Sequence, residues 1–127
     1  MKSLEDVLAE LGTLDRTEVA AWIEARWVRP DPQEGGFGFR SVDVARLRLI
    51  RELRHELGID EETMPVVLSL IDEVYGLRRA LMALARALGE TPVELQRSVL
   101  ARCRVLLREL DEVEDGAGAG AAEREAP

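Results

Sequence analysis

The alternation of hydrophobic and polar positions is most regular between Asp60 and Leu88. Apolar residues recur there at spacings of four, three, four, three and four positions, the heptad period of a helix with one apolar seam. The seam comprises Leu70, Val74, Leu77, Leu81, Leu84 and Leu88. Pro65 suits a first helical turn, and either Asp60 or Thr63 can be the N-cap, with Thr63 favoured by the proline. The pattern therefore predicts a long central helix.

This helix has a second apolar face close to its start. The face is formed by Met64, Val67, Leu68 and Ile71, so we expect other helices to cover that end. The seam beyond it fits two arrangements. It can be the core of a monomer, or it can pair in a coiled coil between two copies at the Leu77–Leu88 end. We favour the homodimer and keep the core helix as the alternative.

Two short helices are predicted in the N-terminal part of the chain, between Ser3 and about Ala25. The first, LEDVLAEL, follows a Ser3 cap and is closed by Gly12. The second starts at Asp15 or Thr17 and runs to about Ala25. Its apolar face is Val19, Trp22 and Ile23. The brief connection between the two helices is typical of a helix-turn-helix.

A proline- and glycine-rich stretch follows, and its composition indicates a small β-hairpin. Trp27-Val28 and Phe37–Phe39 flank the stretch, and these aromatic residues together with Trp22 are expected to form a small core. A third helix then begins at a Ser41 cap and ends at Gly58. Its predicted apolar stripe is Val42, Ala45, Leu47, Leu49, Ile50, Leu53 and Leu57.

The sequence Gly89-Glu90-Thr91-Pro92 predicts the end of the central helix and the start of a last one. The last helix should run from about Pro92 to Glu112 and fold back on the central helix. Residues 113–127 are mostly Ala, Gly and Glu, a composition that favours a disordered tail. We thus expect three regions. Residues 1–60 form a helix-turn-helix with the small hairpin as its wing, residues 61–112 serve dimerisation and partner binding, and residues 113–127 are the tail.

The net charge of the chain limits the classes of molecule that it can bind. The 127 residues carry 17 Lys and Arg against 25 Asp and Glu, a net charge of −8. Residues 1–60 have a net charge of −3 and residues 61–127 of −5, so neither half is basic and nucleic acid is disfavoured as a partner. No apolar run approaches the roughly 20 residues that span a bilayer. With one cysteine and no signal-peptide pattern at its start, the chain is expected to be cytoplasmic.

The residues that could support catalysis do not form a recognisable set. His55 has no second ligand or base one helical turn away, and we expect it to be an exposed surface residue. Cys103 lies on an apolar stripe and is expected to be a buried small hydrophobe. Asp72 and Glu73 are adjacent in a helix, so their carboxylates diverge. We therefore predict no catalytic residue, no metal site and no cofactor, and a protein that is not an enzyme.

Two segments resemble the MerR-type winged helix-turn-helix. They are WVRP, before the hairpin, and FGFRSVDVARLRLIRELRHELGI, after it. The continuation, ELRHELGIDEETMPVVLSLIDEVYGLRRAL, is similar to the MerR-like branch of chaperone modulators, the CbpM type. The resemblance covers residues 3–88 and is most specific over 42–88. It implies a mainly α fold: a winged helix-turn-helix with a small hairpin wing, then a long coiled-coil-like helix and a C-terminal helix.

The resemblance also implies a function. A CbpM-type adaptor binds the J-domain of a DnaJ-like co-chaperone of the CbpA type and inhibits its work with Hsp70. J-domains have a basic second helix, which an acidic adaptor can cover by charge complementarity. The partner-binding positions that match the shared segment are Asp60, Glu61, Glu62, Asp72, Glu73 and Tyr75.

A MerR-like DNA-binding regulator is the alternative. MerR regulators commonly have an arginine followed by an aromatic pair in the recognition helix, whereas this chain has Ala20-Ala21-Trp22 at that place. The predicted helix from Asp15 to Arg26 has a net charge of −1, which gives little affinity for phosphates. Arg40 and Arg46 near the wing keep this alternative open, and a purely oligomerising module is a third.

Overall fold

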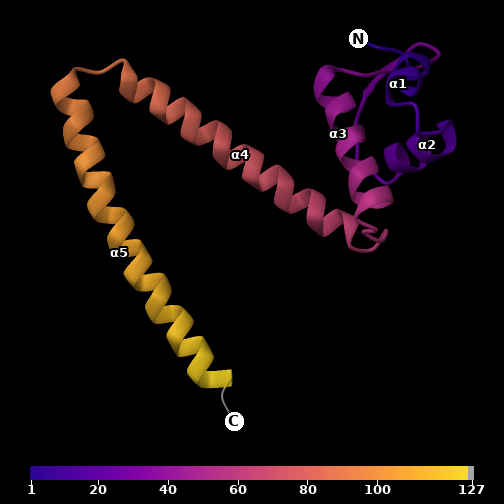
Figure 1. Cartoon of the computed structure of the whole chain (residues 1–127). Helices are drawn as coiled ribbons and strands as arrows, with labels where there is room; N and C mark the ends of the chain where they lie inside the picture. Colours follow the sequence, from indigo (N-terminus) through magenta and orange to yellow (C-terminus); the bar gives the residue numbers. More distant parts are fainter. Residues whose placement is uncertain (126–127) are drawn as a thin grey trace. The chain divides into compact units, whose positions relative to one another are not determined.

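The computed structural model describes residues 1–125, with side chains as far as Gly116. The chain divides into two units, Met1–Val74 and Tyr75–Pro127. As predicted, the fold is mainly helical with one small antiparallel hairpin (Figure 1). The elements in chain order are α1 (Leu4–Leu11), α2 (Arg16–Glu24), β1 (Asp31–Gln33), β2 (Gly36–Gly38), α3 (Ser41–Arg51), the π-helical turn η1 (Glu52–Glu56), α4 (Met64–Gly89) and α5 (Val93–Glu125).

The first two helices begin and end at the predicted signals. The Ser3 hydroxyl accepts a hydrogen bond from the Asp6 amide at 3.2 Å, and the Asp6 carboxylate accepts one from the Ser3 amide at 3.1 Å. This reciprocal capping box satisfies two amides at the start of α1. Gly12 ends α1 with a φ of 46°. Asp15, one of the two predicted caps, accepts from the Glu18 amide at 2.8 Å.

The hairpin is present, but its first strand lies later than predicted. Pro32 pairs with Phe37 in the register of β1 and β2, so the proline belongs to a strand and not to the loop. A two-stranded hairpin has only edge strands, where a missing N–H is tolerated. Trp27 and Val28 precede β1 and are buried in the core. The N-terminal Lys2 forms a further antiparallel bridge with Phe39, which follows β2.

The third helix differs from the prediction at both ends. Arg40, and not Ser41, is the N-cap residue, because the Asp43 carboxylate accepts a hydrogen bond from the Arg40 amide at 2.9 Å. At the other end the helix widens into η1, where the Leu57 amide donates to the Glu52 carbonyl at 3.0 Å, five residues back. Gly58 ends the segment with a φ of 66°, as predicted.

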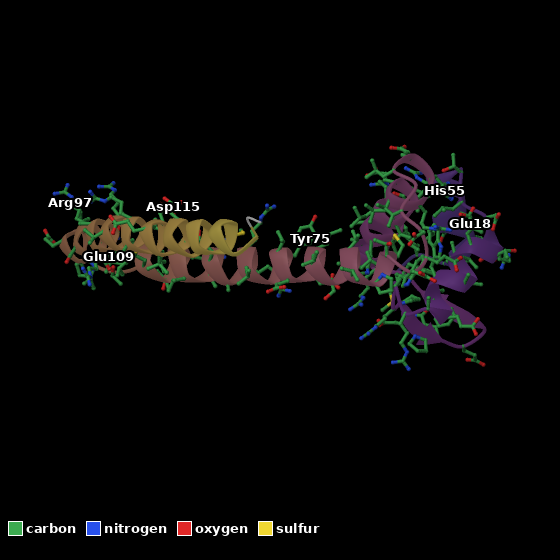
Figure 2. The ribbon with its side chains drawn as sticks, turned by 90° about the horizontal axis from the view of Figure 1, so that it is seen from below. Glu18, His55, Tyr75, Arg97, Glu109 and Asp115 are labelled. Atoms are coloured by element: carbon green, nitrogen blue, oxygen red, sulfur yellow. The ribbon has the colours of Figure 1, made fainter. Side chains whose placement is uncertain are left out.

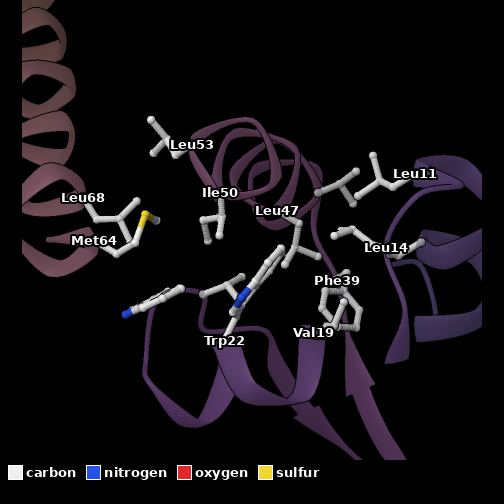
Figure 3. Close-up of a cluster of buried hydrophobic side chains, with 14 residues drawn as sticks. Leu11, Leu14, Val19, Trp22, Phe39, Leu47, Ile50, Leu53, Met64 and Leu68 are labelled. Atoms are coloured by element: carbon white, nitrogen blue, oxygen red, sulfur yellow. The ribbon is translucent and has the colours of Figure 1, made fainter. Parts of the chain in front are cut away.

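The hydrophobic core described in the first unit is formed by α1, α2, α3 and the start of α4, with Trp27 and Val28 before the hairpin and Phe39 after it (Figure 3). The Trp22 and Trp27 rings are stacked at 6.4 Å in it, whereas Phe37 is 40% exposed and does not belong to the aromatic core that was predicted. The stripe of the third helix is also shifted from the prediction, because Val42 and Leu57 are exposed. The buried apolar positions are Val44, Leu47, Ile50 and Leu53.

The start of α4 is anchored in this core. Met64 and Leu68 are buried, and Val67 and Ile71 pack against them, which confirms the predicted second apolar face. Thr63 directly precedes the first residue of α4, but the capping hydrogen bond is made by Asp60, the other predicted cap, whose carboxylate accepts from the Thr63 amide at 2.7 Å. The start of α4 thus belongs to the first unit, which extends to Val74.

In the second unit, the corner between α4 and α5 is held by Gln96, which donates to the carbonyls of Gly89 at 3.2 Å and Thr91 at 2.8 Å. Helix α5 continues to Glu125, beyond the end expected at Glu112, so the residues predicted as a disordered tail are helical to that point. Alanine has the highest helix propensity, and no proline interrupts this run. Residues 126–127 of the expected tail lie outside the described residues.

Candidate partner-binding surface

The three acids ahead of α4 have different structural roles. Asp60 accepts a hydrogen bond from the Thr63 amide at 2.7 Å. Hydrogen bonds from the side chain and backbone of Thr63 hold the pKa of the Asp60 carboxyl below its ordinary value. Glu61 lies 3.9 Å from Arg54 and is 81% exposed, so this ion pair is loose. Glu62 is exposed. Asp60 therefore shapes the turn, while Glu61 and Glu62 present their charge to solvent.

Asp72 and Glu73 also differ in role, because the first makes hydrogen bonds within the protein and the second faces solvent. The Asp72 carboxylate accepts two hydrogen bonds from the Arg46 guanidinium, at 2.5 and 3.2 Å, and Arg46 also donates to the Trp27 carbonyl. This bidentate pair joins α4 to α3. Glu73 is exposed and has no ion pair within the described part of the chain. The divergence expected of two adjacent helical carboxylates is thus seen in that Asp72 pairs with Arg46 while Glu73 faces solvent.

Tyr75 begins the second unit and is 55% exposed (Figure 2). The guanidinium of Arg78, one turn later, lies 6.0 Å from the centre of the tyrosine ring, within the range of a cation–π interaction. Neither Arg78 nor Arg79 forms an ion pair with a described residue.

The predicted heptad seam is not covered by any part of the chain whose side chains the structure describes. Leu70, Val74, Leu77, Leu81 and Leu84 are each more than half exposed, and only Leu88 is partly buried. The fold-back of the last helix is not formed either, because Leu95, Leu106 and Leu110 of α5 are also exposed. The Leu77–Leu88 stretch is therefore not an intramolecular core in this structure. Its pairing with a second copy stays a prediction.

A contact between helices distant in sequence was missed by sequence reasoning. His55 Nε2 lies 2.5 Å from a carboxylate oxygen of Glu18 (Figure 2). The imidazole and the Trp22 ring form a T-shaped pair with their centroids 6.4 Å apart. The exposed position expected for His55 is observed, since its side chain is 40% exposed. Its partner comes from α2 and not from its own helix.

The expectation for Cys103 was wrong. The thiol is exposed, because the stripe on which it lies has no helix packed against it. Among the residues the structure describes, no group of three or more His, Cys, Asp or Glu side chains could hold a metal ion. Within the same residues, no helix is both long and apolar enough to cross a membrane.

Comparison of the chain with protein-family models, with curated proteins and with solved structures gives no match.

Proposed function

We propose that this chain is an adaptor of the chaperone-modulator type, which binds the J-domain of a DnaJ- or CbpA-like co-chaperone and inhibits its activity with Hsp70. The observation that carries the proposal is a set of exposed side chains at and just before the start of α4 that form no close ion pair with a described residue. Glu62 and Glu73 are exposed without ion pairs among the described residues, and Glu61 has only a loose one. Tyr75 follows as an exposed aromatic residue, the type that anchors many protein interfaces.

The mechanism is competition without chemistry. A basic helix of the J-domain would lie against these carboxylates and would then be unable to engage Hsp70. Complementary charge accelerates association and orients the partner, while an apolar anchor slows dissociation. Asp60 and Asp72 have a supporting part in this scheme, because their carboxylates hold the turn and the helix that present the others.

DNA binding is the weaker candidate for the same fold. Arg16, on α2, is paired with Glu5 at 2.7 Å. Arg40 and Arg46, the two arginines near the wing that favoured DNA binding, also form ion pairs. Arg40 pairs with Asp43 at 3.2 Å, and Arg46 pairs with Asp72. Arginines neutralised in this way contribute little to phosphate binding.

Titration against an isolated J-domain tests the proposal. The double variant Glu62→Lys with Glu73→Lys should weaken binding roughly tenfold at low salt, because two attractive contacts become repulsive. Added salt should weaken binding of the parent protein as well. The matched control is Glu114→Lys with Asp115→Lys, which makes the same change in net charge on exposed residues of α5 and should leave the affinity unchanged.

The proposal fails if the parent protein does not bind the J-domain, or if both double variants bind it equally well. Tight, sequence-selective binding to duplex DNA at physiological salt would instead favour the regulator.

A further inference from the structure

A groove of about 540 Å³ lies in the first unit, at the C-terminal end of α2 and the N-terminal ends of α3 and α4. Its charged lining consists of Arg26, Arg29, Arg40, Arg46, Asp43 and Asp72. Four arginines against two aspartates leave a surplus of two positive charges. A local surplus of this kind is unexpected on a chain with a net charge of −8.

The surplus resides on two particular arginines. Arg40 is paired with Asp43, and Arg46 is paired with Asp72. Arg26 and Arg29 are exposed and make no side-chain hydrogen bond or ion pair with any residue that the structure describes. Their guanidinium groups offer ten N–H donors in all, in a geometry that matches carboxylates.

Arg26 is held in a backbone conformation that disfavours arginine. Its φ of 64° makes it the only non-glycine residue with a positive φ among the described residues. The Arg26 amide donates to the Ile23 carbonyl at 3.0 Å and the Trp27 amide to the Trp22 carbonyl at 2.9 Å, which is a Schellman ending of α2. Glycine is the usual residue at this position, so the strain points to a use for the arginine side chain.

Arg29 is fixed in place by its neighbours. Val28 before it and Pro30 after it are both buried, while Arg29 itself is exposed. A following proline restricts a residue to extended conformations, so little backbone freedom is left to lose on binding.

The groove also has apolar lining. Trp27, Pro65 and Leu68 contribute to it, and Val42 is 62% exposed at its edge. A polyanionic backbone such as that of DNA would gain nothing from these apolar groups. A peptide that alternates carboxylates with apolar side chains satisfies both kinds of lining.

We propose that this groove binds an acidic, apolar-containing peptide segment of a partner protein, with Arg26 and Arg29 as the carboxylate ligands. Arg26 and Arg29 do not belong to the acidic surface proposed above for a basic J-domain helix, and the groove shares only Asp72 with the positions considered there. Either proposal can therefore fail without the other.

The test is fluorescence anisotropy of the full chain with a short labelled peptide that alternates glutamate and leucine. Arg26→Gly is the informative variant, because glycine removes the guanidinium and also relieves the backbone strain, so the fold should be at least as stable. Arg26→Gly and Arg29→Gln should each weaken binding about tenfold, the loss expected for one charge-assisted hydrogen-bonded contact. Arg97→Gln, an exposed arginine of α5, is the matched control and should leave binding unchanged.

The proposal is overturned if the native chain does not bind the peptide at low salt, or if Arg26→Gly with Arg29→Gln binds it as well as the parent does. It is also overturned if a lysine–leucine peptide binds equally well, since the contact would then not depend on carboxylates. Tighter binding of duplex DNA that the same variants abolish would assign the groove to phosphates. Self-association that they abolish would assign it to a second copy of the chain.

Discussion

Asp60 shows how one carboxylate can be both exposed and structural. Its hydrogen bonds with Thr63 favour the charged form, so its pKa in the folded chain lies below the ordinary value of 3.8. A lowered folded pKa means that the charge stabilises the fold at any pH above the ordinary value. That stabilisation is lost as the pH falls through the lower, folded pKa.

The variant Asp60→Asn isolates this charge, because asparagine is also a good capping residue. We expect a lower free energy of unfolding than that of the parent near neutral pH, and a difference that narrows as the pH falls below about 4. Urea denaturation followed by circular dichroism over a pH series measures it. Glu62→Gln, a change at an exposed neighbour, serves as the control. A difference in the free energy of unfolding that stays constant with pH would show that the Asp60 charge does not contribute to stability.

Single residues also show where sequence reasoning stops. The contact between His55 and Glu18 joins positions 37 residues apart, and no local pattern specifies which two helical faces meet. The same holds for Arg46, whose partner Asp72 lies in a different helix. Cys103 was predicted to be buried from its stripe alone, although a stripe is buried only where another element covers it.

At the scale of elements, local capping signals in the sequence predicted most of the helix ends. Ser3, Gly12 and Gly58 act within a turn of their own position, so their effects can be read from the chain. The two ends of α3 could not be read in this way. The π-helical turn η1 has no residue signature, and Arg40 became a cap only through the side chain of Asp43.

The packing of α3 gives a direct test of the core. Leu47 is fully buried, whereas Leu57, a residue of the same type ten positions later, is 69% exposed. Leu47→Ala should lower the free energy of unfolding by about 2–5 kcal/mol, through lost burial and the cavity left behind. Leu57→Ala, the control, should change it by less than about 0.5 kcal/mol. Similar losses in urea denaturation for the two variants would contradict the assignment of this helix face.

At the scale of the whole molecule, the two proposed sites suit an adaptor. The first unit has exposed glutamates around the start of α4 and two unpaired arginines at its groove. The two surfaces favour partners of opposite charge, so one small unit could hold two different polypeptides. The fold class and the acidic positions were available from the sequence, but the groove was not, because its lining comes from three segments brought together only by folding.

The exposed seam of α4 bears on the number of copies in solution. Leu77 and Leu84 are 65% and 68% exposed, and such a regular apolar stripe is costly to leave in water. We expect the parent chain to be a homodimer, and Leu77→Asp with Leu84→Asp to give monomers, because each aspartate would bury a charge in the paired helices. Sedimentation equilibrium measures the mass. The matched control is Val42→Asp with Leu57→Asp, which changes two equally exposed apolar residues outside the seam and should leave the dimer intact. A parent chain that already sediments as a monomer would refute pairing through this seam, and a double variant that remains dimeric would place the interface elsewhere.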